Sequence, residues 1–116
     1  MSQLSIITEN VDISKAAKRA LCHPGEVLRE EFMIPLKLSR NKLALALRVP
    51  SGRITDIVNE KRSITPDTAL RLGRYFGTSA GLWLNLQTSY DLRVAKAEKG
   101  DAIVRDITPM HIQNAA

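Results

Sequence analysis

The sequence holds little of the chemistry on which enzymes and metal proteins depend. Among 116 residues it has one cysteine, Cys22, and two histidines, His23 and His111. A single thiol permits no internal disulfide, and one thiol with two imidazoles falls short of a zinc site. The chain also lacks a glycine-rich phosphate loop and any recognisable grouping of nucleophile, base and orienting residue. We therefore expect a protein that is not an enzyme and that carries no cofactor and no metal.

Long apolar runs and aromatic side chains are also scarce. No stretch approaches the roughly 20 apolar residues that cross a bilayer, and the N-terminus lacks the charged start and long apolar run of a signal peptide. We therefore expect a cytoplasmic protein. Aromatic residues make up 4% of the chain, and Phe76, Trp83 and Tyr90 lie at helical spacing. That spacing favours packing in the core over stacking on nucleic-acid bases.

The charge of the chain is biased toward the positive. Seventeen Lys and Arg residues against twelve Asp and Glu give a net charge of +5 and a pI near 9.7. Such a balance favours an anionic partner. The length suits one domain with a modest core plus tails. We expect an N-terminal arm over residues 1–22, one domain over residues 23–99, and a C-terminal dimerisation segment or tail over residues 100–116.

Cap residues and apolar spacing predict the first three helices. The first covers residues 26–32 and stops before Pro35, because a proline disfavours helical backbone in the residue before it. The second begins after Ser39, whose hydroxyl can cap a helix, and the third opens at Pro50. The expected core-facing residues of the second and third helices are Leu43, Ala44, Leu47, Ile54, Ile57 and Val58.

Two more helices follow. Thr65-Pro66-Asp67 combines a cap, a proline at the first helical position and a first-turn acid, which together start the fourth helix. Gly77 stands where a left-handed residue is wanted at its end. Thr78 or Ser79 caps the fifth helix, which we expect to run until Gly100 stops it.

Residues 102–107 (AIVRDI) are β-branched and loosely alternating, which indicates a strand. A lone strand is unstable, so its partner would be the same strand in a second copy of the chain. A frayed tail and a continuation of the fifth helix are the alternatives. The expected fold is thus all-α, with five helices and a short C-terminal strand that pairs across a dimer.

The second and third helices are separated only by Arg48-Val49-Pro50, which is the pattern of a helix-turn-helix. A DNA-recognition helix needs an apolar inner stripe and an outer row of short polar side chains that can approach base edges, and the third helix has both. Exposed arginines are more often solvated than bound, so the prediction rests on the constellation. The predicted base contacts are Ser51, Gly52, Thr55 and Asp56, and the predicted contacts to the DNA backbone are Arg40, Lys42, Arg53, Lys61 and Arg62.

Several linked motifs match one family. They are residues 23–32 (HPGEVLREEF), 64–72 (ITPDTALRL), 75–79 (YFGTS), 83–87 (WLNLQ) and 90–92 (YDL). This set closely resembles the HigA family of antitoxins, within the wider Xre and lambda-repressor-like helix-turn-helix class. The resemblance covers about residues 22–96.

The resemblance implies a bacterial five-helix DNA-binding domain that dimerises through C-terminal elements and binds a palindromic operator at its own promoter. It also implies direct neutralisation of a HigB-like toxin, which resembles the RelE-type ribonucleases that cut messenger RNA. When bound to its operator, such a protein would be associated with the nucleoid. The family's base-contacting and backbone-contacting positions all fall on residues already named from the pattern. Lys42 is the one residue that the pattern names and the family's positions do not include.

Two departures from the family's pattern stand out. Arg48 occupies the turn position where the family usually has glycine, so either a left-handed backbone there costs about 1 kcal/mol or the turn differs. Gly81 stands where the first turn of the fifth helix often carries an acid, which removes a capping contact and some helix propensity.

The sequence does not identify the toxin-binding surface directly. The N-terminal arm and the outer, acidic face of the first helix, with Glu26, Arg29 and Glu30, are the candidates because they lie away from the expected DNA face. Two other functions stay open. The chain could be a stand-alone Xre-type repressor without a toxin partner, or a protein-interaction module whose helix-turn-helix no longer binds DNA.

Overall fold

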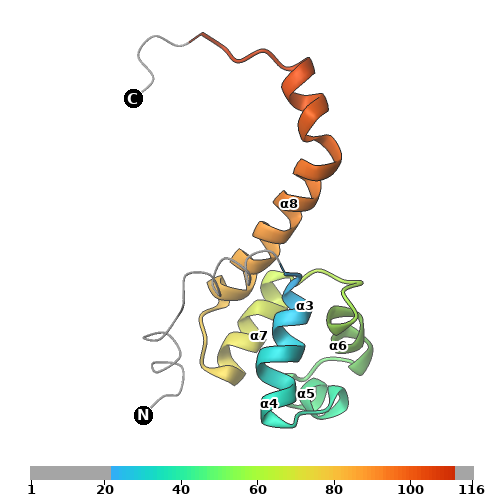
Figure 1. The fold of residues 1–116 in the computed structure, drawn as a ribbon. Helices are drawn as coiled ribbons and strands as arrows, with labels where there is room; N and C mark the ends of the chain where they lie inside the picture. Colours follow the sequence, from blue (N-terminus) through green and yellow to red (C-terminus); the bar gives the residue numbers. More distant parts are fainter. Residues whose placement is uncertain (1–21, 112–116) are drawn as a thin grey trace.

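The computed structural model describes residues 22–111, so almost all of the expected N-terminal arm lies outside the described residues. Helices are the only regular secondary structure within residues 22–111, which confirms the all-α prediction. A first helical run over residues 24–36 comprises α3 (Pro24–Val27), the π-helical η1 (Leu28–Met33) and α4 (Ile34–Leu36). Four further helices follow it: α5 (Arg40–Leu47), α6 (Ser51–Val58), α7 (Pro66–Phe76) and α8 (Ala80–Asp106) (Figure 1).

Three helices begin at the hydroxyl caps that the sequence predicts. The hydroxyl oxygen of Ser39 accepts a hydrogen bond from the backbone N–H three residues further on at 3.1 Å. Thr65 and Ser79 cap α7 and α8 in the same way, at 3.4 and 3.0 Å. Of the two residues considered for the fifth helix, Ser79 is thus the cap, and Thr78 instead accepts the indole N–H of Trp83 at 2.9 Å. Gly77 ends α7 in the predicted left-handed conformation, with φ 75°.

The predicted end of the first helix is wrong. The run starts at Pro24, passes through Pro35 and ends at Leu36. The π-helical turns explain this, because the backbone N–H of Ile34 donates to the carbonyl of Arg29, five residues back rather than four. This wider spacing changes which carbonyls the last turn uses, so that a proline ring without an N–H fits there.

The predicted C-terminal strand is also wrong. α8 continues through Gly100 to Asp106, and residues 102–106 belong to it. A glycine in an exposed helix costs only about 1 kcal/mol relative to alanine, which is too little to stop a long helix. A strand would need a pairing partner, and the described chain contains no other strand. Continuation of the fifth helix, one of the alternatives, is therefore what the structure shows.

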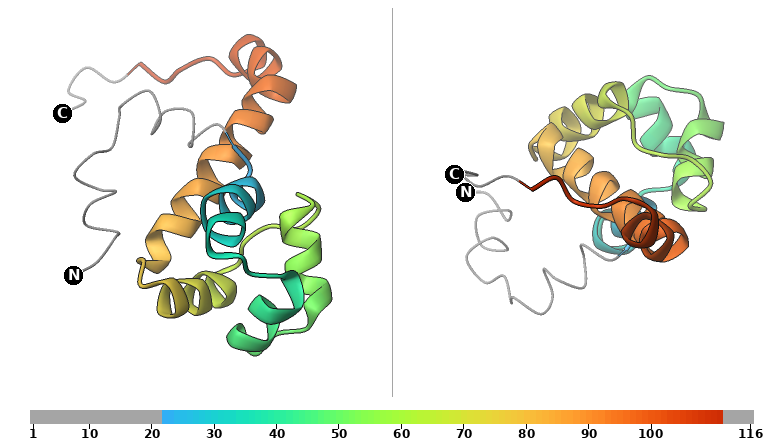
Figure 2. Two further views of the ribbon diagram at one scale, coloured as in Figure 1. Left: turned by 60° about the horizontal axis from the view of Figure 1, so that its bottom comes forward. Right: turned by 90° about the horizontal axis from the view of Figure 1, so that it is seen from above.

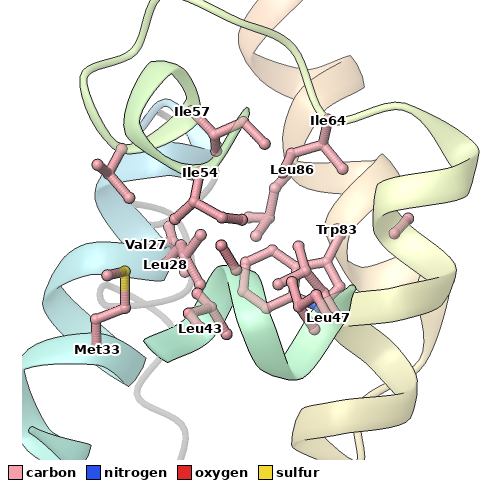
Figure 3. Close-up of a cluster of buried hydrophobic side chains, with 14 residues drawn as sticks. Val27, Leu28, Met33, Leu43, Leu47, Ile54, Ile57, Ile64, Trp83 and Leu86 are labelled. Carbon is pink, nitrogen blue, oxygen red and sulfur yellow. The ribbon is translucent and has the colours of Figure 1, made fainter. Parts of the chain in front are cut away.

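The core lies where the inner stripes of the helices meet. Ile54 and Ile57 of α6 point into the same cluster as Leu28, Leu43 and Trp83 (Figure 3). All five of these side chains are fully buried. Every core-facing residue predicted for α5 and α6 is buried, and so is Trp83, which confirms core packing for that ring. The scaffold therefore fixes α6 from its inner side and leaves its outer side open.

α8 is much longer than the domain needs. Its first half packs beside α7 and α3, whereas its second half projects away from the other helices (Figures 1 and 2). The projecting half exposes the large apolar side chains of Ile103 and Val104, and Leu92 is exposed near the middle of the helix. None of the helices described between residues 22 and 111 is long and apolar enough to cross a membrane.

Three charged residues end successive helices in the left-handed conformation. Lys37, Arg48 and Glu60 have φ values of 55°, 60° and 63°. Around Arg48, two backbone N–H groups donate back to carbonyls in the last turn of α5 at 3.2 and 3.0 Å, which is the Schellman arrangement. Of the two alternatives at Arg48, the left-handed backbone is therefore the one present, without the glycine that would relieve its strain.

Replacing Arg48 by glycine should stabilise the protein by about 0.5 to 1 kcal/mol, because glycine has no Cβ to strain a left-handed backbone. Urea unfolding of the two proteins measures the difference. Arg48→Ala is the matched control, since it removes the same side chain but keeps the Cβ. If alanine stabilised the protein as much as glycine does, the cause would be loss of charge and not relief of backbone strain.

Candidate nucleic-acid interface

The outer face of α6 carries the predicted base-contacting residues. Ser51 and Gly52 are exposed in its first turn, and Thr55 and Asp56 are half-buried one turn later. A Cβ built on Gly52 would meet nothing within 4 Å, so the backbone of this turn is open to a large approaching surface. The structure brings these four residues together on one side of one helix, opposite the buried stripe.

Asp56 forms an ion pair on this face. Its Oδ2 atom lies 3.3 Å from Nη2 of Arg62, and both side chains are about half exposed. A predicted base contact and a predicted backbone contact are therefore joined in the free protein. An acid paired in this way repels DNA phosphate less than an isolated one, and the arginine restricts where its oxygens point.

The other predicted backbone contacts surround α6. Arg40, at the start of α5, donates from Nη2 to the side-chain oxygen of Asn59 at 3.2 Å. Lys42 and Lys61 are exposed on α5 and on the loop after α6. Arg40, Lys61 and Arg62 thus lie near the carboxyl end of α6, where exposed cations are available to bind phosphates beside a groove.

Arg53 reaches from α6 to α7. Its Nη1 atom donates to Oδ2 of Asp67 at 2.9 Å, and Nε of Arg71 donates to the same oxygen at 2.9 Å. The hydrogen bond from Arg71, supported by the charge of Arg71 and by Arg53, lowers the pKa of the Asp67 carboxyl from its ordinary value. Asp67 therefore stays ionised and keeps both guanidinium groups beside it.

Two arginines bind the carboxyl ends of the helix-turn-helix. Nη1 of Arg71 donates to the backbone carbonyl of Leu47 at 2.9 Å, and Nη1 of Arg29 donates to that of Val58 at 2.6 Å. These carbonyls belong to the last residues of α5 and α6, where the negative end of each helix dipole favours a cation. Sequence reasoning missed both contacts, because a helix-capping arginine carries no local sequence signal.

The candidate toxin-binding residues fall into two groups. Glu30 is exposed, and its carboxylate pairs with Arg29 at 2.9 Å. Arg29 is committed to the carbonyl of Val58 and is only 32% exposed in its side chain. Glu26 is half-buried and accepts a hydrogen bond from the Cys22 thiol at 3.2 Å. Only Glu30 of the three presents most of its charge to solvent.

His23 and Gln87 are buried polar residues that sequence reasoning did not single out. Nδ1 of His23 accepts the backbone N–H of Gly25 at 2.9 Å and so caps α3. Proline favours the first position of a helix, so Pro24 was a usable sequence signal that His23 is the cap residue. Gln87, on α8, accepts the backbone N–H of Ile64 at 2.7 Å and thereby anchors the loop between α6 and α7.

The stability of the protein should fall as the pH falls below about 7. Burial lowers the pKa of His23 from its ordinary 6.5, against a smaller opposite effect of Glu60 and Asp91. In the unfolded chain the His23 imidazole is therefore protonated near pH 6.5, whereas in the folded chain it is protonated only at lower pH. Stability is complete above pH 6.5 and is lost progressively as the pH drops toward the folded pKa.

Urea unfolding at pH 8 and pH 5.5 measures this dependence. His23→Asn keeps a capping acceptor and removes the titration, so it should reduce the difference between the two pH values. His111→Gln, at an exposed position, is the control and should leave the difference unchanged. An equal pH dependence in His23→Asn and in the unmodified protein would contradict the assignment.

Comparisons with known proteins place this geometry in a class. A family model described as Helix-turn-helix matches residues 28–83. The chain is 58% identical over 77 residues to Virulence-associated protein I of Dichelobacter nodosus, covering 66% of this chain and 71% of that protein. It is 38% identical over 78 residues to the HTH-type transcriptional regulator YbaQ of Escherichia coli K12, covering 67% of this chain and 69% of that protein.

A solved structure narrows the class. The Pseudomonas aeruginosa antitoxin HigA, determined with the higBA promoter, superposes with a TM-score of 0.77 at 47% sequence identity, covering 78% of this chain and 99% of that one. Helix-turn-helix proteins of this class are not enzymes, in agreement with the sequence. The chain belongs to the HigA family of the Xre and lambda-repressor-like helix-turn-helix class.

Proposed function

We propose that this protein is the DNA-binding antitoxin of a toxin–antitoxin pair, which binds a palindromic operator at its own promoter and neutralises a HigB-like, mRNA-cleaving toxin by direct contact. The observation that carries the proposal is the outer face of α6, where short polar side chains lie together and the cations Arg40 and Arg62 lie close by. A relative 47% identical to this chain, whose solved structure includes promoter DNA, supports it. We place the protein in the bacterial cytoplasm, associated with the nucleoid when it is bound.

The same proposal assigns residues to DNA. Ser51, Gly52, Thr55 and Asp56 contact base edges in the major groove, where their small size allows close approach. Arg40, Lys42, Arg53, Lys61 and Arg62 contact phosphates, and each phosphate neutralised adds about 0.9 to the slope of log affinity against log salt on B-form DNA.

The protein acts as a homodimer that forms through the projecting half of α8. This half exposes Ile103 and Val104, while Leu92 is exposed near the middle of α8 and Ile107 just after its end. These side chains are 51 to 80% exposed, and a second copy would bury them. The expected helix–helix contact replaces the strand pairing that the sequence suggested. In such a dimer the two α6 helices should lie about 34 Å apart, one turn of DNA, or a multiple of that distance.

Sedimentation velocity tests the dimer. Ile103→Lys should shift the protein toward monomer, because it places a charge in the apolar contact. Lys99→Gln, which removes a charge from the same half of α8, is the control and should leave the dimer intact. A dimer unaffected by Ile103→Lys would place the interface elsewhere.

The toxin-binding surface is the outer face of the first helical run, with Glu26, Arg29 and Glu30. Of these, Glu30 offers a carboxylate to a basic partner, whereas Arg29 serves mainly to hold α6. Because the net charge of the chain is positive, the contact with a basic ribonuclease must be local rather than a broad match of opposite charges.

A gel-shift titration on the protein's own promoter fragment tests the function. The protein is titrated at two salt concentrations, with and without the product of the adjacent gene, and a scrambled duplex of equal length serves as control. A specific, salt-sensitive complex that changes with the neighbouring product supports the antitoxin. Absence of any preference for the promoter fragment would contradict DNA recognition and would favour the protein-interaction module.

A second candidate is a stand-alone transcriptional repressor with no toxin partner. The 38% identity to YbaQ, described as an HTH-type transcriptional regulator, favours it. In the same experiment a stand-alone repressor would bind the promoter specifically and would ignore the neighbouring product.

A further inference from the structure

Asp67 joins three helices through two arginines. Its Oδ2 atom accepts Nη1 of Arg53 from α6 and Nε of Arg71 from α7, both at 2.9 Å. Arg71 also donates to the carbonyl of Leu47 at the end of α5. One carboxylate oxygen therefore connects the first turn of the recognition helix α6 to α7, and through Arg71 to the end of α5.

This cluster contributes little to the stability of the fold. The side chain of Asp67 is 56% exposed and that of Arg71 is 39% exposed. Ion pairs this open to water gain little, because solvent screens the charges and the side chains lose freedom when they are held. The geometry of the cluster is better explained by the direction that it gives to Arg53.

The hydrogen bonds that hold the Asp67 carboxylate come from Arg53 and Arg71. A groove of about 540 Å³ opens beside Asp67 and Arg71, lined also by Ala46, Leu70 and Tyr75. The carboxylate is thus held mainly by guanidinium groups, and Arg53 in turn is held at its tip by Asp67. The side chain of Arg53 is only 29% exposed, and its Nη1 atom is the part that Asp67 holds.

We propose that Asp67 is a positioning residue for DNA recognition, which holds the Arg53 guanidinium ready to contact one operator phosphate; this inference rests on the DNA-binding function proposed above. An arginine held before binding loses less conformational freedom when it binds than one that is free. The negative charge of Asp67 also weakens attraction to DNA of any sequence. Asp67 therefore raises the preference for the operator, where Arg53 meets its phosphate in register, over unrelated DNA.

The test compares the full-length protein with Asp67→Asn on the operator and on a scrambled duplex, over a series of salt concentrations. Asparagine is nearly the same size and removes only the charge. Operator affinity should fall about five- to tenfold, the loss expected when one long side chain must be immobilised on binding. Affinity for the scrambled duplex should be unchanged or higher. Glu31→Gln, on η1, removes a negative charge elsewhere and should lower affinity for neither duplex.

A double-mutant cycle separates positioning from a general charge effect. In an Arg53→Ala background, Asp67→Asn should no longer lower operator affinity, because the residue that it directs is gone. Asp67→Glu, which keeps the charge, should recover part of the operator preference. Additive effects of the two substitutions, or equal gains on both duplexes in Asp67→Asn, would overturn the inference. Failure of the unmodified protein to prefer the operator would instead contradict the proposed function.

Discussion

Gly25→Ala is expected to destabilise the protein by about 3 kcal/mol or more, because the added methyl group has no space and its neighbours cannot move aside. A Cβ at this position would lie 1.8 Å from the carbonyl oxygen of Ile57 and 2.8 Å from its carbonyl carbon. Both atoms are backbone. Gly25 thus marks the place where the start of α3 meets the end of α6, and any larger residue must push the recognition helix away.

The measurement is thermal unfolding followed by circular dichroism, together with operator affinity at a temperature where the variant is folded. For a domain of this size the loss corresponds to a fall of roughly 15 °C in Tm. Gly100→Ala is the matched control. Its Cβ would make an ordinary contact 3.5 Å from the Lys96 side chain, within exposed helix. It should stabilise the protein by about 0.5 to 1 kcal/mol, because alanine favours helix. Equal Tm values for the two variants would contradict the close approach at Gly25.

Gly52→Glu should have the opposite profile, with an intact fold and lost recognition. The first turn of α6 has open space around Gly52, so a glutamate fits without strain. A carboxylate near a helix N-terminus is mildly stabilising. Against DNA, however, it blocks the close approach of the backbone and repels phosphate, and we expect operator affinity to fall about 100-fold or more, the equivalent of about 3 kcal/mol.

Gel shifts on the operator and thermal unfolding measure the two effects separately. Gly52→Ala is the control for size without charge and should weaken binding less than glutamate does. Gly81→Glu, in the first turn of α8, is the control for added negative charge away from the α6 face. A Gly52→Glu protein that still binds the operator with undiminished affinity would show that this face of α6 does not meet the DNA.

The sequence was informative wherever local chemistry decides the structure. Ser39, Thr65 and Gly77 each act through neighbours a few residues away, and the helices begin or end where these residues predict. The buried stripe of α6 follows from periodicity alone. The signal at Pro35 misled because π-helical hydrogen bonding lets the proline ring fit. The signal at Gly100 misled because its local penalty is smaller than what the remaining hydrogen bonds of the helix contribute.

Contacts between distant residues were beyond what the pattern could give. The pairing of Asp67 with Arg53 depends on how α6 and α7 cross, and that of Asp56 with Arg62 depends on the path of the loop after α6. The close approach of Gly25 to Ile57 depends on how α3 packs against α6. Periodicity selects the face of a helix, but only tertiary packing decides which side chains on two faces meet.

The left-handed turns at Lys37, Arg48 and Glu60 have a consequence for the life of the protein in the cell. Each lowers the free energy of unfolding by up to about 1 kcal/mol relative to glycine at the same position. Together they raise the unfolded fraction by up to about two orders of magnitude. Proteases act on that fraction, so the steady-state amount of protein depends on it. Glycine at all three positions should therefore give a longer-lived protein, one slower to disappear when its synthesis stops.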